Sequence, residues 1–169
     1  MIWWKWLVIV AAIPVGAAAL AYGIGLALPA DHVASVEASV AAPPARVAAL
    51  IRDVEGHPRW RSAVTAIEVR RRFDNGLLYV ERQGNDAITF DLREDRPGAR
   101  FRSTIADPDL SFGGYWTIEL QPSPAGTAIR IEEHGKVTNP LFRFFSRLVF
   151  GHEATMRTYL ADLGRAVGA

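Results

Sequence analysis

The chain of 169 residues contains no cysteine, which excludes disulfide bonds and thiolate chemistry. Acidic residues are absent before Asp31, and Lys5 is the only cation in that stretch. The rest of the chain, from Asp31 onward, therefore carries 18 of the 19 lysines and arginines and all 18 acidic residues, so its formal charges balance. Because phosphate binding needs a positive surplus, we expect no nucleic-acid partner.

Several catalytic motifs are also missing. The sequence has no phosphate-binding loop, no nucleophile elbow around a serine, and no HExxH pattern. Its four histidines, His32, His57, His134 and His152, are too widely spaced to suggest zinc. We therefore expect no metal and no cofactor.

Charge is absent from Trp6 to Leu28, a run of 23 residues. As a helix this run is roughly 34 Å long, enough to cross a hydrocarbon core of about 30 Å. Trp3, Trp4 and Trp6 surround Lys5, which is typical of an interfacial aromatic belt. The pattern predicts a transmembrane helix, so residues 1–30 are interpreted as a membrane anchor and the lipid bilayer as a partner.

Two alternatives to the anchor stay open. Gly25, Leu26 and Ala27 form a small-x-small site at which a signal peptide could be cleaved, although the apolar run is longer than a usual signal core. The second alternative is a buried helix of a soluble domain. Such helices rarely stay uncharged on all faces over this length. Because Lys5 precedes the run and no lysine or arginine follows it until Arg46, we expect a single-pass protein with a cytoplasmic N-terminus and an extracytoplasmic C-terminal domain.

Residues 31–169 have the size of one domain, and their middle part predicts antiparallel strands. Apolar residues alternate with polar ones along 34–40, 67–69, 88–92, 101–105, 116–120 and 127–137. Turn residues separate these segments at 74–76, 84–86, 97–98 and 123–126, which indicates successive hairpins.

Helical patterns flank the strands. Pro43 and Pro44 can open a short helix through 45–54, with a second short turn at 57–63. Near the C-terminus, Asn139 can cap a helix that has Pro140 at its first position. Its broad apolar face runs from Leu141 to Leu163, and we expect this long helix to lie along the concave side of the sheet.

This order of elements resembles the START-like helix-grip superfamily (SRPBCC), which includes lipid-transfer and polyketide cyclase or dehydrase-like proteins. The residues that carry the resemblance are Ala41, Ala42, Pro43 and Pro44, then 53–58 and Trp60, then Gly126, Thr127, Asn139, Pro140 and Leu141. The resemblance covers nearly all of 31–167. It implies an α+β helix-grip fold, in which a curved antiparallel sheet of about six or seven strands packs on a long C-terminal helix, here with one transmembrane helix added.

The resemblance also implies a deep pocket for a hydrophobic small molecule. By strand and helix parity, its candidate ligand-binding residues are Phe90, Phe101, Phe112, Trp116, Ile118, Ile131, Met156 and Tyr159. For each of them, ordinary packing in the core is the alternative. The favoured interpretation is a membrane-anchored, non-catalytic binder of a lipid or other apolar molecule.

Two polar residues keep catalysis open. Glu133 continues the inward face of the last strand, and His152 lies on the apolar face of the expected long helix. Together they are weak candidates for the acid and base of a cyclase, dehydratase or hydrolase-like enzyme. The alternative places Glu133 beyond the buried part of its strand and makes His152 a satisfied core histidine. A tethered interaction module is a third hypothesis, and the sequence does not indicate the oligomeric state.

Overall fold

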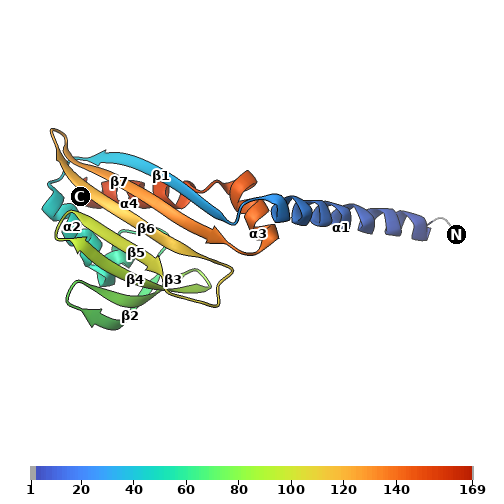
Figure 1. Cartoon of the computed structure of the whole chain (residues 1–169), viewed down its shortest axis with the longest axis horizontal. Helices are drawn as coiled ribbons and strands as arrows, with labels where there is room; N and C mark the ends of the chain where they lie inside the picture. The colour runs from blue at the N-terminus through green and yellow to red at the C-terminus, as the bar shows by residue number, and fades with distance from the viewer. Residues whose placement is uncertain (1–2, 169) are drawn as a thin grey trace.

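The structure, a computed structural model, describes residues 3–168, with no description of the side chains of 3–13, 149 and 150. One helix precedes the first strand, two short helices follow it, and the other helices come after the last strand (Figure 1). In chain order the elements are α1 (Trp3–Ala27), β1 (Asp31–Val40), α2 (Pro44–Arg52), η1 (Val54–Arg59), β2 (Ala66–Phe73), β3 (Gly76–Gln83), β4 (Asp86–Arg96), β5 (Arg100–Ile105), β6 (Phe112–Ser123), β7 (Gly126–Val137), α3 (Pro140–Phe145), η2 (Ser146–Phe150) and α4 (Ala154–Gly168).

The strands form one antiparallel sheet of seven, in the order β1-β7-β6-β5-β4-β3-β2. From β2 to β7 each strand pairs with the next in sequence, and β1 pairs with β7 after the crossover through α2 and η1 (Figure 1). This confirms the expected α+β architecture and the meander of hairpins. β1 begins at Asp31, three residues before the expected start, so His32 belongs to the sheet.

One core joins the inner face of the sheet to α2 and α4. From α4 it takes Met156, Tyr159, Leu160 and Leu163, which recur at helical spacing. The sheet contributes alternate residues such as Phe101 and Ile131, because successive strand side chains point to opposite faces. Burial of each large apolar side chain stabilises the fold by roughly 1.5–3 kcal/mol.

The prediction of one continuous C-terminal helix is wrong, because the segment is divided into α3, η2 and α4. Asn139 does cap α3, accepting a hydrogen bond from the backbone amide of Phe142 at 3.0 Å, and Pro140 follows the cap. The helix then passes into the π-helical turn η2 and stops at Gly151, whose φ of 74° is a left-handed conformation that glycine adopts without strain. His152 therefore lies in the bend between η2 and α4, and of the two C-terminal helices only α4 contributes to the buried core against the sheet.

The end of α1 is joined to the domain by Arg143 of α3. Its guanidinium donates to the carbonyl oxygens of Gly25 at 3.1 Å and Leu28 at 2.8 Å, groups that a helix C-terminus leaves without partners. A Cβ at Gly25 would lie 1.9 Å from the carbonyl oxygen of Pro140, so the two helices touch backbone to backbone. The direction of α1 is thus set by contacts with α3.

The transmembrane anchor expected over 1–30 is not confirmed. Within the described part of the chain, no helix is both long and apolar enough to cross a membrane. Of the expected span over 6–28, positions 6–13 are outside the residues with described side chains. The span, its orientation and the alternative of cleavage after Ala27 stay predictions.

Candidate functional site

A cavity of about 410 Å³ lies between the inner face of the sheet and the segment from α3 to α4. It reaches the surface at Lys136, Gly151 and Thr155, which are exposed and line it. Its apolar lining consists of Ile51, Ile88, Phe90, Leu92, Ile105, Phe112, Trp116, Ile118, Val137 and Phe142. The volume falls within the range of about 300–1,000 Å³ that small-molecule pockets occupy.

The eight expected ligand-binding residues divide into two groups. Phe90, Phe112, Trp116, Ile118 and Tyr159 line the cavity. The other three, Phe101, Ile131 and Met156, are at most 1% exposed and pack in the core instead. Parity identified the inner face, but α2 and α4 cover one part of that face completely and leave the rest open.

The first polar group in the cavity wall consists of His32, Trp116, Glu133 and His152, and is called the carboxylate–histidine group. Nε2 of His32 lies 2.9 Å from one carboxylate oxygen of Glu133, and Nε1 of Trp116 donates to the other oxygen at 2.9 Å. The ring of His152 stacks on that of His32, with centroids 3.6 Å apart and an interplanar angle of 18°. Glu133 and His152 therefore belong to one group, but His32 lies between them.

A glycine makes this arrangement sterically allowed. Gly135 is paired with His32 across β1 and β7, and a Cβ there would lie 2.2 Å from Cε1 and 2.4 Å from Nε2 of that ring. It would also lie 2.9 Å from Oε1 of Glu133. Any larger residue at position 135 would push the imidazole away from the carboxylate.

Burial and the neighbouring His32 lower the pKa of His152, so its imidazole is neutral at neutral pH. Its Nε2 atom is buried and has no hydrogen-bond partner among the described residues. A neutral, stacked imidazole can hold the ring of His32 in place without adding a positive charge there.

The second polar group consists of His57, Arg61, Tyr79, Glu81, Gln83 and Tyr159, and is called the arginine group. Nη1 of Arg61 forms an ion pair with Oε2 of Glu81, whose other oxygen accepts from Gln83 at 2.5 Å. The guanidinium carbon of Arg61 lies 5.2 Å from the ring centroid of Tyr159. Because Glu81 is 1% exposed, these partners replace the water that would otherwise bind its carboxylate oxygens.

Burial sets the protonation of the groups around Arg61. It lowers the pKa of His57 to about 4, with a further contribution from the charge of Arg61. It also raises the pKa of Tyr159 to about 12 and that of Tyr79 above its usual range. At neutral pH the histidine is uncharged and both phenols keep their protons as hydrogen-bond donors.

Tyr159 connects the two groups. Its ring meets that of Trp116 edge to face, with centroids 5.9 Å apart, and lies beneath the guanidinium of Arg61. The two largest polar clusters of the cavity therefore adjoin each other, and the rest of the wall is mostly apolar. Among the described residues, no cluster of three histidines or carboxylates is arranged to hold a metal ion.

Of the arginine group the sequence predicted only Tyr159, and it did not predict His32 as part of the site. Glu81 could have been found, because it continues the buried alternation of Leu77 and Tyr79 along β3. Arg61 gave no such signal, since it lies in a loop after η1. His32 was missed because β1 was expected to begin at Ala34.

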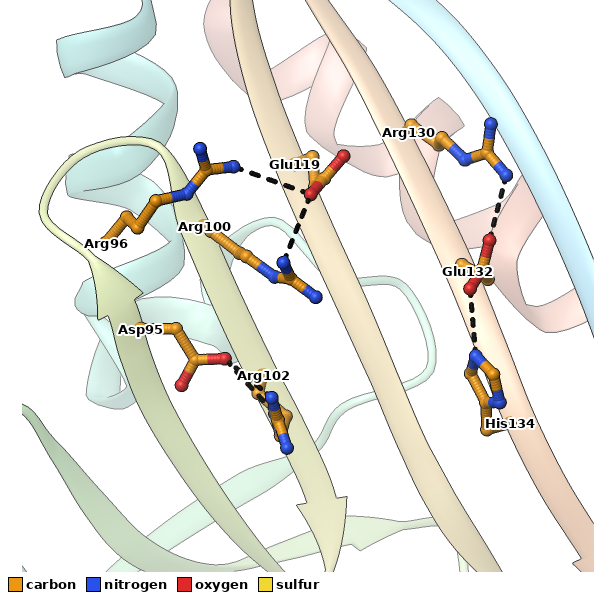
Figure 2. A network of polar contacts seen from close by, with 8 residues as sticks. All are labelled: Asp95, Arg96, Arg100, Arg102, Glu119, Arg130, Glu132 and His134. Carbon is orange, nitrogen blue, oxygen red and sulfur yellow. Dashed lines mark hydrogen bonds and ion pairs between the residues drawn. The ribbon is translucent and has the colours of Figure 1, made fainter.

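A larger groove, of about 610 Å³, lies on the outer face of the sheet, but its lining is mostly polar or charged. On that face, Glu119 lies 3.5 Å from Arg96 and 3.6 Å from Arg100, and Glu132 lies 2.8 Å from Arg130. Figure 2 shows the outer-face network of Asp95, Arg96, Arg100, Arg102, Glu119, Arg130, Glu132 and His134. Since these charges already pair with one another, the interior cavity is the stronger candidate site.

Comparison with known proteins agrees with this fold. Solved structures with similar folds include a START superfamily protein from Mycobacterium smegmatis, with a TM-score of 0.60 and 15% identity, over 82% of this chain and 97% of that chain. A protein from Thermus thermophilus has a TM-score of 0.62 and 22% identity, over 81% and 96% of the two chains. The di-domain ARO/CYC StfQ from the steffimycin biosynthetic pathway has a TM-score of 0.68 and 13% identity, over 82% of this chain. The match covers 51% of StfQ, so this chain spans about half the length of that protein.

No curated protein matches the chain. A family model does match, over residues 31–168, which include the whole sheet, both polar groups and α4. The chain belongs to the family described as polyketide cyclase/dehydrase and lipid transport.

Proposed function

We propose that this protein binds an apolar small molecule in the cavity between the sheet and α4. The observation that carries the proposal is the cavity itself, which has a mostly apolar wall and two polar clusters in it. Such a site removes apolar ligand surface from water, at about 25 cal/mol per Å², and leaves a few polar atoms to orient the ligand.

We further propose that the protein acts at a membrane, with α1 as its tether and the N-terminus cytoplasmic. Among the described residues, every large apolar side chain that is strongly exposed lies on α1, at the start of β1, or on α3 and η2. They are Val15, Leu20, Tyr22, Ile24, Leu26, Val33, Phe142, Phe145 and Leu148. α1 continues from the end of the domain where α3 lies (Figure 1). Apolar surface gathered at one end is typical of a contact with a partner or a lipid surface.

Ligand binding can be tested by blocking the cavity. Full-length protein, purified in amphipol, would be examined by native mass spectrometry and by extraction of bound small molecules. Ile105→Trp places a large ring in the cavity, whereas Thr104→Trp places the same ring on the opposite face of β5. We expect a bound molecule in the wild type and in Thr104→Trp and its loss in Ile105→Trp. An equal content in all three proteins would contradict the proposal.

Proton-transfer catalysis on an apolar substrate is a second candidate function, and the contact between His32 and Glu133 favours it. A carboxylate that accepts from an imidazole fixes its tautomer and stabilises the imidazolium formed when the ring takes a proton. In this version His32 is the base and Glu133 orients it. The extracted molecule would be incubated with wild type and with Glu133→Gln. Conversion by the wild type alone supports an enzyme, and recovery of the unchanged molecule from both supports a binder.

A further inference from the structure

In the ion pair of the arginine group, the arginine has free hydrogen-bond donors, whereas the carboxylate is almost fully buried. Arg61 uses Nη1 for Glu81, and the same atom lies 3.4 Å from Nδ1 of His57. Nε and Nη2 of Arg61 have no acceptor among the described residues. Both atoms keep some accessible surface, since neither belongs to the fully buried polar atoms that lack a partner. Because Arg61 lines the cavity, these two nitrogens are open to a molecule bound there.

The carboxylate of the pair is engaged by two partners and is buried. Glu81 receives Arg61 on one oxygen and Gln83 on the other, and its side chain is 1% exposed. The hydroxyl of Tyr159, which also lines the cavity, has no hydrogen-bond partner among the described residues. A ligand that reaches this place therefore meets N–H and O–H donors.

Charge balance decides which acceptor fits. Arg61 and Glu81 together carry no net charge, so a carboxylate entering the apolar cavity would leave one negative charge uncompensated, close to Glu81. An uncharged oxygen acceptor satisfies the open donors without that cost.

We propose that the ligand of this cavity carries an uncharged acceptor oxygen, such as that of a ketone or an ester, and that Arg61 and Tyr159 bind it in preference to a carboxylate. The proposal rests on the proposed function, since it needs a ligand in the cavity, and it adds the chemical class of the ligand's polar end.

Three naphthalene probes test it. 2-Acetylnaphthalene carries a carbonyl, 2-isopropenylnaphthalene replaces that C=O by C=CH₂ in nearly the same shape, and 2-naphthoate carries a carboxylate. Dissociation constants would be measured by fluorescence titration of full-length protein in amphipol, with empty amphipol as the blank. A hydrogen bond to a charged donor predicts that the ketone binds about tenfold more tightly than the alkene. We expect 2-naphthoate to bind more weakly than the ketone.

Two variants identify the residues responsible. Arg61→Met combined with Glu81→Leu replaces the ion pair by apolar side chains, a change that buried pairs usually tolerate. We expect this double variant to bind ketone and alkene equally. Glu81→Gln leaves the charge of Arg61 uncompensated, so we expect the preference to reverse, with 2-naphthoate binding more tightly than the ketone. If Glu81→Gln does not fold, the double variant still decides the question.

The outcomes separate this inference from the proposed function. If no probe binds the wild type, both fail. If ketone and alkene bind equally well to the wild type, or if the double variant keeps the preference for the ketone, the cavity still binds apolar molecules but the assignment of Arg61 is wrong.

Discussion

Gly135→Ala should disrupt the carboxylate–histidine group, because the new Cβ would lie within 2.2–2.4 Å of two ring atoms of His32. The ring has little room to move away. It stacks on His152 with centroids 3.6 Å apart, and the side chain of His32 is 9% exposed. We therefore expect the 2.9 Å hydrogen bond between His32 and Glu133 to break while Trp116 stays on the other oxygen.

The expected cost follows from that one bond. A hydrogen bond to a charged, mostly buried group contributes roughly 1.5–3 kcal/mol, so Gly135→Ala should lower the free energy of unfolding by about 2 kcal/mol. For a domain of this size, the midpoint of thermal unfolding would fall by about 4–8 °C. Chemical denaturation monitored by circular dichroism measures the first quantity and a thermal scan the second.

Gly113→Ala is the matched control, because Gly113 lies on the neighbouring strand β6 and nothing lies within 4 Å of a Cβ added there. We expect it to be neutral or slightly stabilising. In a His32→Ala background the clash has no ring to displace, and the cost of Gly135→Ala should shrink. Equal effects of the two glycine variants, or an unchanged cost without His32, would refute the steric argument.

Three further predictions concern other contacts. The pKa of His57 is depressed to about 4 in the folded protein, so its contribution to the free energy of unfolding is complete above about pH 6.5 and is lost as the pH falls towards 4. Between these pH values, the free energy of unfolding of the wild type should fall by about 3 kcal/mol more than that of His57→Leu, as measured by denaturant titration at each pH. Arg143→Met removes the donors to the carbonyls of Gly25 and Leu28, and also those to the carbonyls of Val137 and Thr138 at the end of β7. Amide hydrogen exchange should therefore accelerate in the last turn of α1 but not in the central strands of the sheet. Thr127→Val removes the buried hydroxyl that donates to a backbone carbonyl of the loop after β1 at 2.6 Å, which should lower the unfolding free energy by about 1–2 kcal/mol, measured by denaturant titration.

Strand and hairpin patterns predicted most of the sheet, because a sheet that is buried on one face imposes a period of two on its sequence. The same rule placed Phe90 and Trp116 on the inner face. It could not separate them from Phe101 or Ile131, which fill the core, since that difference depends on where α2 and α4 lie across the sheet.

The C-terminal segment shows a second limit. The apolar spacing from Leu141 to Leu163 fits one continuous helix, yet the chain breaks at Gly151. A single glycine is tolerated within many helices, so periodicity alone did not reveal the break. The contact of Glu133 with His32 was beyond reach for another reason. It joins strands that are about a hundred residues apart in sequence, and it needs the missing side chain of Gly135.

The position of a bound probe tests most directly whether the protein binds apolar molecules between its sheet and α4. In the full-length protein with labelled isoleucine methyl groups, nuclear Overhauser effects from 2-acetylnaphthalene would be recorded. We predict contacts with Ile88, Ile105 and Ile118, which line the cavity, and none with Ile131, which is buried in the core. Contacts confined to methyl groups outside the cavity, such as that of Ile24 on α1, would contradict the claim that the protein binds apolar molecules between its sheet and α4.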